Sequence, residues 1–192
     1  MPYPRRPDVP GATYHVTAKG TNDEPIFFDD HDRWVFLMQL ERVAEKYGWV
    51  VLAYCLMRNH YHLVLRVPDG GLSAGMQELN RGYSWRTNRR YGRRMHLFRQ
   101  RFWSAEIDTE SHLLESCRYT VLNPVKAGVC RLPDEWRWSS YRATAGTEPA
   151  PRFLAIDVLL GILDRDPRRA RQTYREFVQA GLVPVSETGV AA

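Results

Sequence analysis

Cysteine is scarce in this chain of 192 residues, which contains only Cys55, Cys117 and Cys130. Their number is odd and no C-x-x-C spacing occurs, so the sequence predicts neither a disulfide framework nor a zinc-finger site. Such a use of cysteine leads us to expect a reduced, cytoplasmic protein.

Long hydrophobic runs are also missing. The longest uninterrupted apolar stretch, residues 49–57, is too short to cross a bilayer, which needs about 20 residues. Residues 1–6 lack the apolar core of a signal peptide. We therefore expect no membrane partner. A P-loop pattern is absent as well, which predicts a protein without a nucleotide cofactor.

Acidic residues are absent from one long stretch, although the chain as a whole has a net charge of only +5. Residues 81–101 contain eight arginines and no Asp or Glu, and Tyr83, Trp85, Tyr91 and Phe98 lie among them. One interpretation is a nucleic-acid surface, where guanidinium groups bind phosphates and rings stack on bases. The other is a solvated helix face followed by a core strand. Arginine rather than lysine favours the first, because a solubilising face needs no bidentate donors.

Hydrophobic periodicity predicts strands that alternate with helices. The expected strands are residues 12–17, 49–57, 60–67 and 98–107, with a tight turn at 58–59 where Asn tolerates a left-handed conformation. The expected helices are residues 30–47, capped by Asp29 or Asp30; 73–91, capped by Ser73; and a third that begins at Thr109 or Ser111 and ends at Pro124.

This order is typical of an α+β protein with a ferredoxin-like antiparallel sheet, βαββαβ, and helices packed on it. We expect one domain over residues 1–145. A linker and a helical C-terminal extension with a loose tail follow over residues 146–192. On the first helix, we expect a buried stripe made of Trp34, Leu37, Met38, Val43, Ala44 and Tyr47.

Two histidines share one face of the predicted strand 60–67. Alternation places His60 and His62 with Val64 and Arg66, whereas the opposite face is wholly apolar and should pack under helices. Imidazoles at i and i+2 of a strand are close enough to bind one divalent ion. A polar, solvated strand face is the alternative.

The third predicted helix presents two more candidate residues. At about 100° per residue, Leu113, Leu114, Cys117 and Val121 cluster on one side. Tyr119 points to nearly the opposite side, with Asn123 one turn further along. The helix could therefore present a phenol and an amide together, or these could be an interfacial tyrosine and a helix-end residue.

At this point the sequence resembles the HUH single-tyrosine transposases, and within them the REP-associated tyrosine transposases. The resemblance covers about residues 12–145 and follows several motifs in the family's order. These motifs are Tyr14-His15-Val16-Thr17, Ile26-Phe27-Phe28, the run 54–65 that contains His60-Tyr61-His62, Leu97 to Phe102, the run 118–128 that contains Tyr119, and Trp138 to Tyr141.

The resemblance implies a metal-dependent enzyme that cuts and rejoins single-stranded DNA, often at the foot of a hairpin, through a 5′-phosphotyrosine. His60 and His62 match the family's metal-binding histidines and Tyr119 its nucleophile. Asn123 stands where a further polar ligand is expected, although it is shorter than the Gln of some relatives. Imidazole suits Mn²⁺ better than Mg²⁺, so we expect Mg²⁺ to support activity and Mn²⁺ to bind better.

Single-stranded or hairpin DNA is the expected partner, with the protein acting as a monomer or a homodimer. The expected DNA contacts come from the arginine-rich stretch and from residues beside the matched motifs. They are Lys19, Arg58, Trp85, Arg86, Arg89, Arg90, Arg93, Arg94, Arg99, Gln100 and Arg101. Tyr91 and Trp103 are further candidates for base stacking.

Two other functions fit parts of the sequence. A non-catalytic DNA-binding regulator on the same scaffold would keep the arginines but would need no metal ligands or tyrosine. A two-histidine phosphoesterase would use two H-x-T or H-x-S motifs, of which the chain has one, His15-Val16-Thr17. The combined presence of two histidines and a tyrosine argues against the regulator, and the lack of a second such motif argues against the phosphoesterase.

Overall fold

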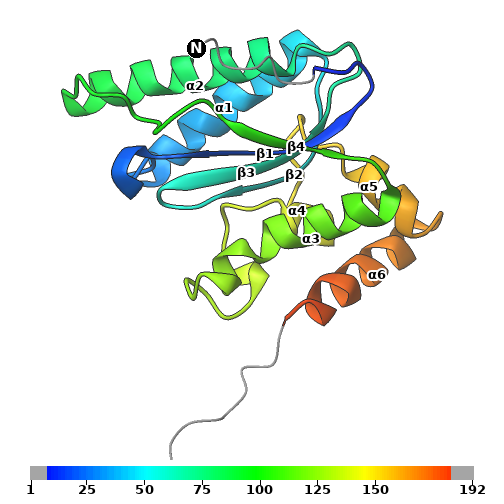
Figure 1. Ribbon diagram of the computed structural model, residues 1–192. Helices are drawn as coiled ribbons and strands as arrows, with labels where there is room; N and C mark the ends of the chain where they lie inside the picture. Colours follow the sequence, from blue (N-terminus) through cyan, green and yellow to red (C-terminus); the bar gives the residue numbers. More distant parts are fainter. Residues whose placement is uncertain (1–7, 183–192) are drawn as a thin grey trace, which may run out of the picture.

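The computed structural model describes residues 8–182, which form a four-stranded antiparallel sheet with helices on both faces (Figure 1). Its strands are β1 (Thr13–Lys19), β2 (Val50–Leu56), β3 (His60–Arg66) and β4 (Trp103–Ile107). The helices are α1 (Asp30–Tyr47), α2 (Leu72–Tyr91), α3 (Glu110–Lys126), α4 (Tyr141–Ala145), α5 (Ile156–Leu163) and α6 (Pro167–Ala180). Short 3₁₀ helices cover Thr21–Asp23 and Pro133–Glu135.

The strand order β2-β3-β1-β4 confirms the predicted ferredoxin-like sheet. Helices α1 and α2 each connect two strands that are not neighbours in the sheet, so β1 lies between β3 and β4. The register pairs Lys19 with His60 and Thr17 with His62. This pairing brings the histidine strand beside β1 rather than at an edge of the sheet.

Two hydrophobic cores lie on opposite faces of the sheet. Tyr61, Leu63 and Leu65 are fully buried under α1 and α2, as the apolar face of the strand predicted. Val64 faces the other way and packs with Val121 of α3 and with residues of α5 and α6. Figure 1 shows the two layers, with α1 and α2 on one side and α3, α5 and α6 on the other.

Two predicted helix boundaries are wrong. Helix α2 begins at Leu72 behind a left-handed Gly71, and the Leu72 N–H donates to the Asp8 carboxylate at 2.9 Å, so Ser73 is not the cap. Helix α3 runs through Pro124 to Lys126. A proline removes one hydrogen bond of the helix, but the buried residues before it hold the last turn against the sheet.

The predicted strand 98–107 is also too long. Strand β4 begins at Trp103, and the residues before it cross to the end of β1, where the Arg99 N–H donates to the Lys19 carbonyl at 2.9 Å. The turn at 58–59 forms without the left-handed conformation considered for Asn59. Among the described residues, the non-glycine residues with positive φ are Asn22 and Asp23.

The buried stripe of α1 is only partly as predicted. Leu37, Val43 and Ala44 are buried, but Trp34 is 53% exposed and Met38 is 68% exposed. Phe36 and Leu40 take their places, because their spacing of i and i+4 faces the sheet.

No helix in residues 8–182 is both long and apolar enough to cross a membrane. The predicted loose tail lies largely outside the described residues.

Candidate active site

The histidine face of β3 is covered by α3 rather than solvated. His62 is only 7% exposed and His60 is half-buried. The alternation of β3 places both rings on this face, and the order of the sheet places β1 next to them. The solvated strand face considered above is therefore wrong for His62.

A third imidazole lies beside the pair. The Nε2 atom of His15, on β1, lies 2.9 Å from Nδ1 of His62, and the two rings stack with centroids 5.2 Å apart. On the other histidine, Nδ1 of His60 lies 2.8 Å from Oδ1 of Asn59, while its Nε2 lies 3.3 Å from Oδ1 of Asn123. Each ring of the pair is thus held at its Nδ1 side.

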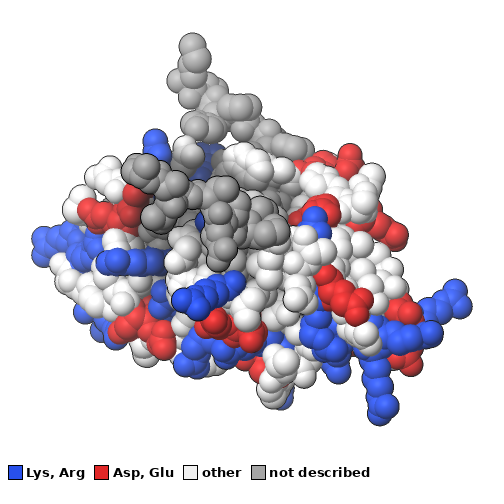
Figure 2. Space-filling model, turned by 90° about the horizontal axis from the view of Figure 1, so that it is seen from below, with Lys and Arg blue, Asp and Glu red and all other residues white. Residues whose placement is uncertain are grey.

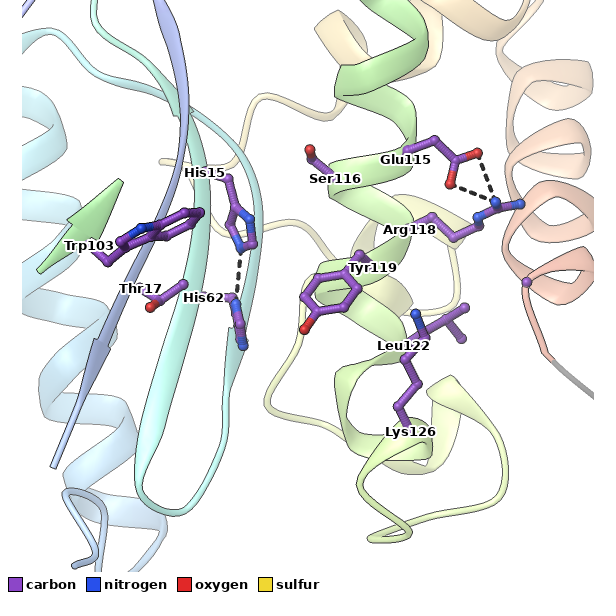
Figure 3. A pocket seen from close by; sticks show the side chains of 11 residues that line it. His15, Thr17, His62, Trp103, Glu115, Ser116, Arg118, Tyr119, Leu122 and Lys126 are labelled. Carbon is purple, nitrogen blue, oxygen red and sulfur yellow. Dashed lines mark hydrogen bonds and ion pairs between the residues drawn. The ribbon is translucent and has the colours of Figure 1, made fainter. Parts of the chain in front are cut away.

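Tyr119 extends from α3 toward these rings. Its ring centroid lies 5.7 Å from that of His62 and 5.9 Å from that of His15, both in edge-to-face contacts. The phenol is 42% exposed, and Figure 3 shows its hydroxyl pointing from the helix toward the sheet. The Nζ atom of Lys126 lies over the same ring, 4.6 Å from its centroid.

A cavity of about 550 Å³ opens between the sheet and α3. The wall formed by the sheet includes His15, His62 and the exposed Trp103, and the wall formed by α3 includes Tyr119 and Lys126 (Figure 3). The other lining residues are Thr17, Glu115, Ser116, Arg118, Leu122 and Gly181. Its volume is large enough for a nucleotide-sized group.

Arg118 and Lys126 differ in what surrounds their charges. Arg118 forms an ion pair with Glu115 at 2.6 Å and its guanidinium stacks on Phe177 of α6, so its charge is compensated. Among residues 8–182, no carboxylate lies within ion-pair distance of Lys126. Lys126 is therefore a cation available to a phosphate that enters the cavity.

Burial controls the protonation of the imidazoles. Desolvation lowers the pKa of His62 to about 3 and that of His15 to about 4, and it also lowers the pKa of His60. All three rings are therefore neutral near pH 7. A neutral imidazole has one nitrogen lone pair, which is the form that binds a metal ion.

The histidines of this site can hold a divalent cation only if an amide oxygen serves as a further ligand. In the described part of the chain, no three His, Cys, Asp or Glu side chains converge on one point in the way a metal ion requires. His60 and His62 would need Asn123, whose Oδ1 lies 3.3 Å from His60 Nε2. Two ligands at right angles around one ion, each at about 2.1 Å, lie about 3 Å apart, so the observed separation suits a shared ion. Two imidazoles and an amide oxygen are compatible with Mn²⁺ or Mg²⁺.

Most of the arginine-rich stretch lies away from this cavity. Helix α2 packs on the opposite face of the sheet from α3 (Figure 1), so Trp85, Arg86 and Arg89 do not face Tyr119. They border a separate pocket of about 420 Å³ beside α1. Arg99, Gln100 and Arg101 line a third pocket, about 1080 Å³, between α2 and residues 95–102.

Two arginines of the stretch make ion pairs within the protein. Arg90 bonds to Asp29 and Asp32 at the start of α1, at 2.6–2.8 Å, and Arg93 pairs with Glu24 at 2.6 Å. Arg94 is exposed. All the predicted DNA contacts stay predictions.

Two of the expected DNA contacts, Lys19 and Arg58, lie beside His60. Lys19 is the register partner of His60 and pairs with Asp23 at 2.7 Å, and Arg58 stands in the turn before His60. They lie at the end of the sheet where His60 lies.

The face that includes α3 and α6 is not uniformly basic. Figure 2 shows Lys and Arg side chains intermixed with Asp and Glu around its rim. The part of this face that Figure 2 shows therefore has no continuous positive surface.

Sequence reasoning missed three residues of this site. His15 was considered as half of an H-x-T motif and Asn59 as a turn residue. All three, including Lys126, lie in motifs of the family resemblance, but none was given a role in the site. The alternation of residues 14–17 already puts His15 opposite the buried Tyr14, but only the pairing of β1 with β3 shows which histidine it contacts.

Comparison with known proteins shows the family of the chain. A family model described as "Transposase IS200 like" matches residues 8–120, which is more than half of the chain. The chain belongs to this family. The matched range includes His15, His60, His62 and Tyr119 and ends before Asn123.

Individual relatives confirm the resemblance to REP-associated tyrosine transposases. A Haemophilus influenzae protein that carries this name is 24% identical over 158 residues, which cover 77% of this chain and 89% of the relative. A solved structure of a REP-associated tyrosine transposase bound to a REP hairpin superposes with a TM-score of 0.65 at 18% identity. The superposition covers 79% of this chain and 89% of the other, and it shows that the two share a fold.

Proposed function

We propose that this member of the IS200-like family cuts and rejoins single-stranded DNA at hairpin-associated sites, with Tyr119 as nucleophile. One observation supports this most directly: the Tyr119 phenol lies against the His62 and His15 rings at one cavity. The phenol and the imidazoles come from the same chain, so a second copy is not needed to bring them together.

The cleavage step would be a transesterification. The Tyr119 oxygen attacks the scissile phosphorus, and the bond from phosphorus to the 3′-oxygen breaks. The phenol gives up its proton, the departing 3′-oxygen takes one up, and the 5′ end remains bound as a phosphotyrosine. Because phenolate is a competent leaving group, a DNA 3′-OH can reverse the step without a nucleotide cofactor.

His60, His62 and Asn123 would hold a divalent cation next to Tyr119. When bound there, the cation would polarise the phosphate and stabilise its developing charge. Burial keeps the imidazoles neutral, and α3 brings the amide to them from the same face as the phenol. Lys126 can contact a non-bridging phosphate oxygen, because it lines the cavity above Tyr119.

A labelled DNA hairpin with a single-stranded flank tests the proposal. The protein is incubated with it and Mn²⁺, and the products are separated on a denaturing gel. We expect a covalent protein–DNA band that is absent with Tyr119→Phe. Cleavage without an adduct would indicate a phosphoesterase, whereas a native-gel shift without cleavage would indicate a non-catalytic DNA-binding regulator.

The metal ligands are tested separately with His60→Ala. We expect this variant to lose cleavage but to keep hairpin binding, because the arginines of α2 lie on the other face of the sheet. Wild-type cleavage by this variant would contradict the assignment of His60 as a ligand. His31→Ala, at an exposed histidine on α1, is the matched control.

A further inference from the structure

The two histidines proposed as metal ligands have the same arrangement of partners. Each has a hydrogen-bond partner at Nδ1, Asn59 for His60 and His15 for His62. The Nε2 atom of His60 faces Asn123 of α3, and that of His62 lies on the side of the ring away from His15 (Figure 3). A histidine whose Nδ1–H donates to a partner has its lone pair on Nε2.

The orientation of the Asn59 amide determines the proton position on His60. Its Nδ2 donates to the Asp23 carbonyl at 3.2 Å, so its Oδ1 is the atom that meets His60 Nδ1 at 2.8 Å. An amide oxygen only accepts, so the single proton of neutral His60 serves the shorter contact, Nδ1 to Asn59 at 2.8 Å, rather than the 3.3 Å contact of Nε2 with Asn123. The lone pair of the neutral ring is then on Nε2, which faces Asn123.

The contact between His15 and His62 allows the same arrangement. Two neutral rings at 2.9 Å must share one proton, with one nitrogen as donor and the other as acceptor. If His62 donates from Nδ1, its Nε2 is left with the lone pair on the side away from His15 (Figure 3). His15 then accepts at Nε2 and has its own proton on Nδ1.

We propose that Asn59 and His15 are positioning residues that hold His60 and His62 in the Nδ1–H tautomer, with both Nε2 lone pairs directed to one cation. The inference rests on the metal-dependent function proposed above. Partners of this kind fix the orientation of ligand imidazoles, and their removal lowers metal affinity by about 10- to 100-fold.

The tautomers can be observed without any metal. Long-range ¹H–¹⁵N spectra of the full chain, labelled at histidine and recorded near neutral pH, distinguish a protonated ring nitrogen from one with a lone pair. We expect lone pairs on Nε2 of both His60 and His62. A proton on Nε2 of either ring would overturn the assignment of its partner.

Metal affinity provides the second measurement, by titration with Mn²⁺ alone. His15→Phe keeps an aromatic ring but removes the acceptor, and Asn59→Ala removes the amide. We expect each to weaken Mn²⁺ binding by about 10- to 100-fold. His15→Gln, whose amide oxygen can accept from His62, should recover most of the affinity. The control is His112→Phe, the same change at an exposed histidine of α3 that pairs with Asp108.

The outcomes separate the inference from the proposed function. Wild-type protein that binds no Mn²⁺ overturns both. A second outcome overturns only the positioning role: the wild type binds Mn²⁺ and forms the Tyr119 adduct, but His15→Phe and Asn59→Ala bind Mn²⁺ with the same affinity as the wild type. Loss of affinity in His15→Gln equal to that in His15→Phe would likewise refute the role of His15 as an acceptor.

Discussion

Removing one oxygen atom from each of two tyrosines should separate catalysis from stability. Tyr119 is half-exposed, and no hydrogen bond to its hydroxyl is found within residues 8–182. Tyr83 is fully buried on α2 and donates to the Ile26 carbonyl at 2.6 Å. Tyr→Phe is thus the same chemical change in two opposite environments.

The structure sets the expected magnitudes. Tyr83→Phe leaves a buried carbonyl without this donor, which costs about 1.5 kcal/mol, within the usual range of about 1–3 kcal/mol. For a chain of this size, that corresponds to a Tm lower by about 3–6 °C. Tyr119→Phe should change stability by less than about 0.5 kcal/mol, since it alters an exposed group.

Thermal unfolding, monitored by circular dichroism, measures the effect on stability. Adduct formation on a denaturing gel measures the effect on catalysis. We expect Tyr83→Phe to form the covalent adduct at temperatures well below its Tm, and Tyr119→Phe to form none while melting like the wild type. An adduct with Tyr119→Phe would refute the choice of nucleophile. A Tm loss in that variant as large as in Tyr83→Phe would show that its hydroxyl is structural.

Three further changes test other parts of the structure. Arg86→Ala, at an exposed position on α2, should weaken hairpin binding for every DNA sequence and reduce the slope of log affinity against log salt by about 1, measured by fluorescence anisotropy. Arg90 lowers the pKa of Asp29, so their pairing stabilises the fold above the ordinary aspartate pKa and is lost as the pH falls through the acid range. Urea unfolding should therefore show Arg90→Met less stable than wild type at neutral pH, with the gap closing in acid. Gly75→Ala should cost about 1–3 kcal/mol in the same assay, because a Cβ atom at Gly75 would overlap the Trp49 ring.

Local patterns in the sequence predicted the elements and much of the site. The alternation of residues 60–67 assigned each side chain of β3 to its face, and the helical spacing of residues 113–123 put Tyr119 away from the packed stripe. Such patterns need only neighbouring residues, because strand and helix periodicities come from the backbone itself. The resemblance to the transposase family added roles for particular residues.

Boundaries and long-range contacts were less predictable. Proline usually ends a helix, but the buried residues beside Pro124 keep α3 intact to Lys126. An arginine-rich helix suggests a DNA surface, yet the Arg90 side chain pairs with Asp29 and Asp32 at the start of α1. In both cases tertiary contacts outweigh a local preference, and local sequence does not contain those contacts.

By itself, the sequence determined which side chains share a strand face or a helix face, because that depends on dihedral angles repeated along a few residues. Only the tertiary structure decided that His15 contacts His62, that Asn123 reaches His60, and that Tyr119 faces both β1 and β3. These contacts join residues that lie 47 to 104 positions apart in the sequence. They exist because strand order and register bring β1 beside β3, and because a second hydrophobic core presses α3 against that side of the sheet.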